Sequence, residues 1–219
     1  WDVSDNSEMT FIASTVSTDE VSNYLSLDLE WSPYYLFDNL VVSGLMEIDD
    51  GVDLQISTNK GITIKGELNV GSASLHGVDW SGILVDGGNI NFEGTYLLNA
   101  VQSLELVNSA SAVLGNVTLY NSINGHIMIS SGSSVTLSDS TLELGDDCIK
   151  TSNHIDNLLN IFSSNISSCN VGIRATNSQI NFNQIIMYGL NTGIRAVDVN
   201  GVISNILMDE IERNGLEII

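Results

Sequence analysis

The sequence predicts an all-β fold: a single-stranded parallel β-helix of about eight to nine coils, each 21 to 24 residues long. The first observation is a direct repeat, because NVGIRA at 170–175 returns as NTGIRA at 191–196. The second is that apolar markers recur at intervals of 22, 21, 21, 23, 22, 24, 21 and 22 residues. These markers are Leu40, Ile62, Ile83, Leu104, Ile127, Ile149, Ile173, Ile194 and Leu216.

Each interval is expected to hold three short strands. One strand contains the marker, and two further apolar-alternating pieces follow it, such as 178–183 and 184–189, or 133–138 and 140–145. Asn, Ser and Gly separate these pieces and indicate turns. The repeat region has no sustained 3.6-residue apolar period and lacks the L-x-x-L-x-L-x-x-N frame, so a leucine-rich repeat is disfavoured.

The chain divides into a short leading segment and the repeats. Residues 1–39 keep the period poorly and contain the only proline, Pro33, so they are expected to form an N-terminal cap over the first coil. Residues 40–219 are expected to form the β-helix. The chain stops at Ile218-Ile219, just inside a new coil, which predicts that a further segment or an end-to-end contact with a partner covers this end.

The charge balance and the distribution of apolar residues disfavour several classes of partner. The 219 residues contain 27 acidic and 6 basic side chains, and the formal net charge of −21 disfavours nucleic acid and anionic membranes as partners. No apolar run is long enough for a membrane span. Cys148 and Cys169 lie about one coil apart, so they could form one disulfide or remain two buried thiols.

Three phrases in the early repeats carry a resemblance. LVVSGLMEIDDGVDLQI at 40–56, GITIKGELNVGS at 61–72 and VDWSGILV at 78–85 resemble the opening coils of secreted and cell-surface right-handed parallel β-helix proteins. The resemblance covers residues 36–219 and implies right-handed coiling and an extracellular or cell-surface location. It does not imply one activity, since that architecture hosts polysaccharide-cleaving enzymes, adhesins and structural spacers alike.

A second, partial resemblance concerns catalysis. The phrase Gly145-Asp146-Asp147-Cys148 is similar to the G-D-D-C motif of polygalacturonase-type glycoside hydrolases, which implies Asp146 and Asp147 as part of an inverting carboxyl set. One coil earlier, 124–126 reads Asn-Gly-His where that family has Asn-Thr-Asp. One coil later, 171–172 reads Val-Gly where it has Gly-His-Gly. The other interpretation is that the aspartates cap a turn.

Basic residues gather at one position of the repeat. If the markers point inward, the next residue points outward, which places Lys150, Arg174 and Arg195 in one column between Met128 and Glu217. Such a stack of like charges needs compensation. One interpretation is that the stack binds an acidic glycan or an acidic partner surface. The other is an ion-pair ladder with the acidic neighbours Asp146, Asp147, Asp198 and Glu217.

The remaining candidates are metal ligands. His76, His126 and His154 have no common spacing, so no metal or catalytic triad is predicted from them. Asp49, Asp50 and Asp53 either hold Ca²⁺ or belong to a solvated turn. Together these features predict a non-catalytic extracellular or cell-surface module acting as a rigid stalk or as a polysaccharide- or protein-binding face. The alternative is a polysaccharide-cleaving enzyme, or a degenerate descendant of one, using Asp146 and Asp147.

Overall fold

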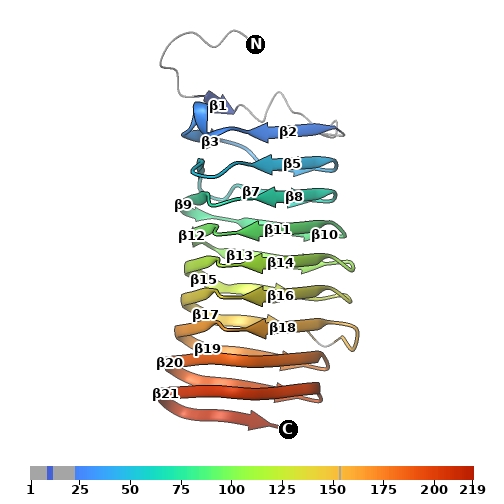
Figure 1. Ribbon diagram of the computed structural model, residues 1–219, viewed down its shortest axis with the longest axis vertical. Helices are drawn as coiled ribbons and strands as arrows, with labels where there is room; N and C mark the ends of the chain where they lie inside the picture. The colour runs from blue at the N-terminus through green and yellow to red at the C-terminus, as the bar shows by residue number, and fades with distance from the viewer. Residues whose placement is uncertain (1–8, 12–22, 153) are drawn as a thin grey trace.

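The computed structural model describes residues 9–11, 23–152 and 154–219 and shows a parallel β-solenoid of about nine turns (Figure 1). About 73% of the residues lie in strands, and every strand pairing in the described part of the chain is parallel. The one helical segment in those residues is a 3-10 turn at Leu29–Trp31. Among them, none forms a helix that could span a membrane. The predicted all-β parallel fold is therefore confirmed.

Three ladders of stacked strands make up the walls, and the first ladder contains the markers. All nine markers are in register from coil to coil, from Leu40 opposite Ile62 to Ile194 opposite Leu216. The ladder comprises β4 (Leu40–Val42), β7 (Gly61–Ile64), β10 (Gly82–Asp86), β13 (Gln102–Val107) and the C-terminal parts of β15 (Thr118–Ile129), β17 (Thr141–Thr151), β19 (Asn165–Thr176), β20 (Gln179–Val197) and β21 (Asn200–Ile218).

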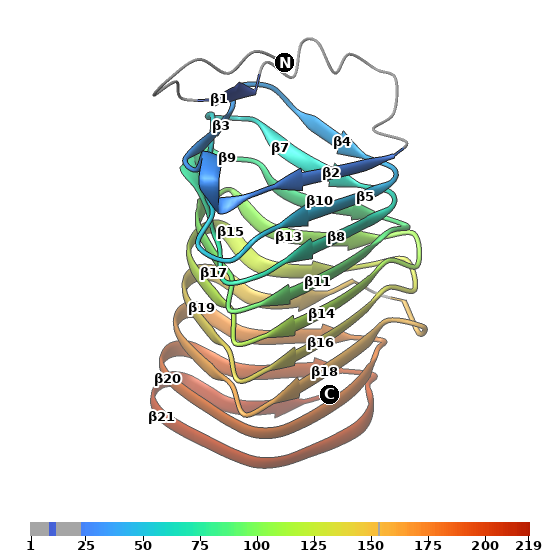
Figure 2. The same ribbon diagram turned by 45° about the horizontal axis from the view of Figure 1, so that its top comes forward.

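The second ladder follows the first in each coil and stacks in one plane (Figure 2). It comprises β2 (Tyr24–Leu27), β5 (Leu45–Ile48), β8 (Glu67–Val70), β11 (Asn89–Glu93), β14 (Ser111–Gly115), β16 (Ser134–Ser138), β18 (Leu158–Phe162) and the starts of β20 and β21. Its side chains alternate strictly between core and solvent, for example in β16 and β18.

The third ladder closes the coil. It comprises β1 (Met9–Phe11), β3 (Tyr34–Leu36), β6 (Asp53–Ile56), β9 (Ser74–Trp80), β12 (Tyr96–Ala100), the starts of β15, β17 and β19 and the middle parts of β20 and β21. From β15 onward the third strand of one coil continues without a break into the first strand of the next. In β20 and β21 the second strand joins this run as well, so each of the last two coils is one continuous strand.

The core is a set of inward columns that run the length of the solenoid. Eight of the nine markers are at most 2% exposed, and only Leu216 in the last coil is open, at 50%. Because each buried Leu or Ile contributes about 2 kcal/mol of transfer free energy, this column is a main source of stability. The predicted inward marker column is confirmed.

Corners between strands use left-handed backbone conformations. Positive φ angles occur at a corner in almost every coil, mostly at Asn, Asp, Ser or Gly, which tolerate them. Leu144 is an exception with φ of 60°, and its side chain is 37% exposed. A bulky residue is strained in this region of φ, so Leu144 is an unfavourable choice in the bend within β17.

The solenoid begins before residue 40. Strands β2 and β3 pair in parallel with β5 and β6, so part of the predicted 1–39 cap contributes strands to the ladders. The rest of that segment, residues 1–8 and 12–22, lies outside the described residues. Right-handed coiling stays a prediction.

Candidate functional site

The basic column lies on the outer surface of the first ladder, as predicted. Met128, Lys150, Arg174, Arg195 and Glu217 occupy equivalent positions on successive coils. Lys150 is exposed and the two arginines are half-buried. The strands that carry these cations lie about 4.8 Å apart, so the repulsion between neighbouring cations must be compensated locally.

Asp147 supplies the main compensation. Its carboxylate is buried, with the side chain 8% exposed, and it accepts two hydrogen bonds from Arg174: Nε to Oδ2 at 2.9 Å and Nη2 to Oδ1 at 3.0 Å. This two-point geometry is the strongest form of the Arg–carboxylate pair. The pKa of Arg174 is raised, chiefly by its hydrogen bond to Asp147. The hydrogen bonds to Asp147 therefore favour the charged form of Arg174.

The other two cations also have acidic partners. Lys150 Nζ lies 3.9 Å from Asp147 Oδ2, and Arg195 Nε lies 3.5 Å from Glu217 Oε2. With Asp146 beside them, three carboxylates accompany three cations, so the cluster is close to neutral. The geometry is that of the ion-pair ladder, one of the two interpretations left open by the sequence. An anionic ligand would compete with carboxylates already in place.

Asp146 has a different role from Asp147. It is exposed and accepts a hydrogen bond from Asn170 Nδ2 at 2.9 Å. Asn170 Oδ1 in turn accepts one from Asn191 Nδ2, also at 2.9 Å. These side chains form a row of hydrogen bonds along the bend between the third and first strands. Asp146 is the first acceptor in this row, which is compatible with its interpretation as a structural residue at the bend.

The catalytic hypothesis therefore has little support in this geometry. An inverting glycosidase needs one protonated carboxyl as general acid and a second carboxylate to activate water. Both carboxylate oxygens of Asp147 already accept hydrogen bonds from Arg174, so they are occupied within the protein. The residues in register with it on the adjoining coils are Gly125 and Val171, and neither adds a carboxyl or an imidazole.

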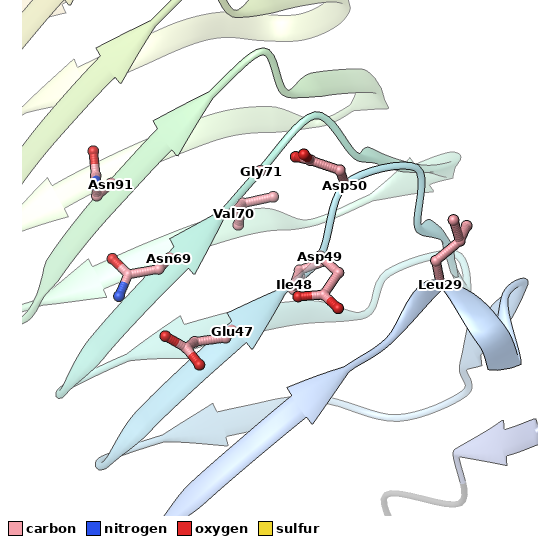
Figure 3. A pocket seen from close by; sticks show the side chains of 9 residues that line it. All are labelled: Leu29, Glu47, Ile48, Asp49, Asp50, Asn69, Val70, Gly71 and Asn91. Carbon is pink, nitrogen blue, oxygen red and sulfur yellow. The ribbon is translucent and has the colours of Figure 1, made fainter.

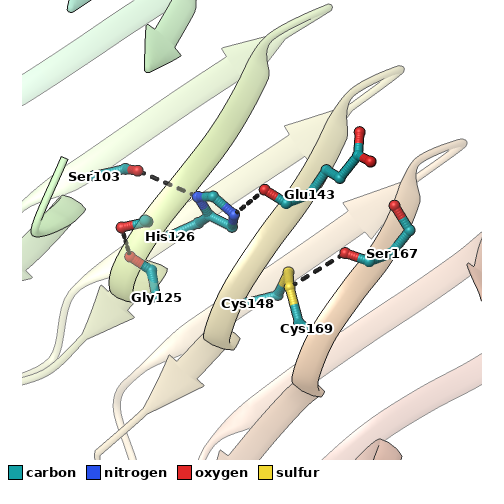
Figure 4. The surroundings of a disulfide bond; sticks show 8 residues. Ser103, Gly125, His126, Glu143, Cys148, Ser167 and Cys169 are labelled. Atoms are coloured by element: carbon teal, nitrogen blue, oxygen red, sulfur yellow. Dashed lines mark hydrogen bonds between the residues drawn. A yellow bond between two sulfur atoms is a disulfide. The ribbon is translucent and has the colours of Figure 1, made fainter. Parts of the chain in front are cut away.

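Cys148 and Cys169 form a disulfide across one coil, with 5.8 Å between their Cα atoms (Figure 4). The disulfide lies directly against His126, which is fully buried. His126 Nε2 is 3.0 Å from the Glu143 carbonyl oxygen and Nδ1 is 3.2 Å from Ser103 Oγ. Because a carbonyl only accepts, Nε2 carries the proton and Nδ1 accepts from the Ser103 hydroxyl.

Burial lowers the pKa of His126 to about 4. The imidazole is therefore neutral at pH 7 and acts as a core polar group with both nitrogens satisfied. His126 and the two sulfur atoms lie within 4.8 Å of one another, which is close enough to share a metal ion. The disulfide removes the two thiolates that such an ion would need, so the cluster is a structural element in this state.

The calcium candidates are only partly brought together. Asp49 and Asp50 line a hollow of about 600 Å³ on the outer side of the early coils, together with Glu47, Asn69 and Asn91 (Figure 3). Asp53 instead begins β6 in the third ladder, where its Oδ1 lies 2.6 Å from His76 Nε2 on β9. Asp50 Oδ1 already accepts from the Ser72 amide at 2.7 Å. Calcium binding stays a prediction.

A second hollow, of about 440 Å³, lies on the first ladder among the early coils. Val41, Thr63, Leu84 and Glu105 line it, and these residues belong to the same outward column as the basic stack. It contains one carboxylate, and no basic side chain is among its lining residues. Its composition points to no particular reaction.

Comparison with models of known protein families finds no match, and a search of curated protein sequences likewise finds none. Sequence reasoning also missed the Ser103–His126 pair. The available signal was that Ser103, His126 and Cys148 each stand immediately before a marker. All three side chains are buried there.

Proposed function

We propose that this chain is a non-catalytic β-solenoid module of an extracellular or cell-surface protein, which acts as a rigid spacer and presents its outer faces to polysaccharide or protein partners. The observation that carries the proposal is the ion pair between Asp147 and Arg174. Asp147 belongs to Gly145-Asp146-Asp147-Cys148, the motif that resembles a catalytic one, and the ion pair supports a structural role for it. The continuous ladders supply the stiffness that a spacer needs.

The disulfide supports the proposed location. Cys148 and Cys169 are bonded within the core, and such bonds persist in oxidising compartments. The surface charge of −21 suits a module that stays soluble in a crowded extracellular matrix. Partners of this kind would be reached through side chains on the outer faces of the ladders.

The last coil is a further candidate for contact. β21 pairs with β20 on one side, and its apolar side chains Leu216 and Ile218, which continue the buried columns of Ile194 and Ala196, are 50% and 65% exposed. An end-to-end contact with another β-strand segment would cover them and continue the ladders.

The alternative function is polysaccharide cleavage, favoured by the exposed Asp146 beside Asp147. The deciding experiment incubates the purified chain with polygalacturonate and follows new reducing ends and unsaturated products. We expect no product from the wild type or from Asp147→Asn. Cleavage by the wild type that is abolished in a folded Asp147→Asn variant would replace our proposal with the enzymatic one.

A further inference from the structure

The outer face of the second ladder changes character halfway along the solenoid. In the early coils its outward positions carry the acidic side chains of Glu47, Glu67 and Glu93. From β14 onward no outward position carries a charge. The charge-free face comprises Ser111, Val113, Gly115, Ser134, Thr136, Ser138, Leu158, Asn160, Phe162, Gln179, Asn181, Asn183, Asn200, Val202 and Ser204.

Such a surface is unusual for this protein. The chain has 33 charged residues, 27 acidic and 6 basic, yet three outward positions on each of five consecutive strands have none. Acidic residues stand at its edges instead: Asp139 at one corner, and Asp156 and Asp198 on the other side. Removing charge from a water-facing sheet has no benefit for solubility, whereas interface centres are depleted of charge because charged groups are costly to desolvate.

The chemistry of the face suits hydroxyl groups. Amides and hydroxyls both donate and accept hydrogen bonds, as sugar hydroxyls do. Among the described residues, the side chains of Gln179, Asn181 and Asn200 make no hydrogen bond within the protein, so they are available to a ligand. Val113 and Val202 are more than half exposed and Phe162 is half-buried, which provides apolar contact for the C–H faces of sugar rings.

The face is also periodic. Thr136, Asn160 and Asn181 are in register on β16, β18 and β20, with about 4.8 Å between neighbouring strands. A linear polymer lying along this column meets a polar side chain at three successive coils, with Val113 before them and Val202 after them. Figures 1 and 2 show the second-ladder strands stacked as one continuous wall. Several weak hydrogen bonds can then act together without one deep pocket.

Other occupants are less well matched. Nucleic acids and acidic glycans are repelled by a net charge of −21, and the face offers no cation to offset that repulsion. A second copy of the chain carries the same charge and is repelled as well. A neutral ligand has no such cost.

We propose that the charge-free face from β14 to β21 binds a neutral polysaccharide chain. This inference deepens the proposed function and rests on it, because it names the wall that binds and the class of polysaccharide; it does not depend on whether the module is catalytic. It also places binding on a different wall from the basic column of the first ladder.

The test uses affinity electrophoresis of the purified chain in gels containing soluble β-glucan, galactomannan or dextran, with polygalacturonate as the anionic comparison. We expect retardation by at least one neutral polymer and none by polygalacturonate. Calorimetry with the retarding polymer should give a dissociation constant that changes less than about two-fold between low and high salt, because no charge takes part.

Two isosteric substitutions locate the face. Asn181→Asp puts a carboxylate in the middle of the charge-free face and should weaken binding about ten-fold, since it removes a donor and adds a charge that must be desolvated. Asn91→Asp makes the same change in the same outward column among the acidic coils, and should leave binding within about two-fold of the wild type.

Two folding controls and one assembly control complete the design. Thermal unfolding of both variants should match the wild type, because both positions are exposed. Absence of retardation by all three neutral polymers, or equal loss in the two variants, would overturn the proposal. Sedimentation that shows a dimer dissociated by Asn181→Asp would also overturn it, by assigning the face to a second copy.

Discussion

Arg174 holds Asp147 through two parallel hydrogen bonds of 2.9 and 3.0 Å that connect neighbouring coils of the solenoid. The carboxylate is buried while the guanidinium is 32% exposed, so the pair lies at the boundary between core and solvent. Removing the acid would leave a half-buried cation without its main partner. The pair therefore fixes both the local packing and the charge balance of the basic column.

Replacing Asp147 by Asn should lower the free energy of unfolding by about 2 kcal/mol, less than for a fully buried pair because water screens Arg174. Urea unfolding at pH 7 measures the change. Asp146→Asn is the matched control at an exposed neighbour and should cost less than about 0.5 kcal/mol. Equal losses in the two variants would contradict the assigned role.

His126 should make stability depend on pH. Its pKa falls from an ordinary 6.5 in the unfolded chain to about 4 in the folded state, so the unfolded state binds more protons between these values. The contribution is fully present above pH 6.5 and is lost as the pH falls to 4, by roughly 3 kcal/mol in total. Unfolding free energies measured between pH 7 and pH 4 should show this loss.

The matched variants for this test are His126→Gln and His154→Gln. His126→Gln should reduce the difference in stability between pH 7 and pH 4, whatever its effect at pH 7. His154 is exposed, so His154→Gln should retain the full pH dependence. A wild-type pH dependence in the His126 variant would show that other groups cause it.

The disulfide should stabilise the solenoid by restricting the unfolded chain. Its two cysteines are 21 residues apart, and a loop of this size corresponds to about 3 kcal/mol. The double variant Cys148→Ala/Cys169→Ala should therefore unfold at a lower urea concentration and keep a native circular dichroism spectrum. A variant as stable as the wild type would show that the disulfide does not stabilise the folded state by restricting the unfolded chain.

Inward and outward isoleucines should respond differently to the same change. Ile173→Asp buries a carboxylate in the marker column and should cost several kcal/mol, enough to unfold the domain. Ile186 is 45% exposed on the third ladder, so Ile186→Asp should cost less than about 1 kcal/mol. Thermal shifts of similar size would contradict the register.

Leu144 offers a stabilising change. Its φ of 60° is costly for Leu and acceptable for Asn, while its exposed side chain contributes little burial. Leu144→Asn should raise the free energy of unfolding by about 1 kcal/mol. The control is Ile186→Asn, because Ile186 is an exposed aliphatic residue whose φ is not positive. This variant should show no increase in the free energy of unfolding. An increase there would mean that a more polar surface, and not the relief of backbone strain, stabilises Leu144→Asn.

The periodic part of this structure could be predicted from sequence alone because stacked coils enforce one register. Once Ile173 and Ile194 were recognised as equivalent, the outward positions of Lys150, Arg174 and Arg195 followed from the alternation of a strand. The fold and the basic column needed no information beyond the spacing.

The details of the candidate site could not be predicted because alternation fails at the bend. The register shifts between Ser122 and Gly125, and consecutive residues are then buried, as Asp147 and Cys148 are. The ion-pair interpretation names Asp147 as a neighbour of the basic column, but the alternation of a strand does not predict that its carboxylate is buried beside Arg174. The packing of His126 against the disulfide depends on the same irregular bend. The alternation of inward and outward residues along a regular strand does not predict it.

The disulfide has a mechanical consequence, because it links two adjoining coils covalently. Under tension, a solenoid of this kind would unfold one coil at a time. A pull on the two ends would peel coils away in sequence, and the loop between Cys148 and Cys169 would carry no load. The extended chain would then be shorter by about 70 Å, the contour length of those 21 residues. The crosslink thus limits how far the module can lengthen before its covalent backbone bears the force.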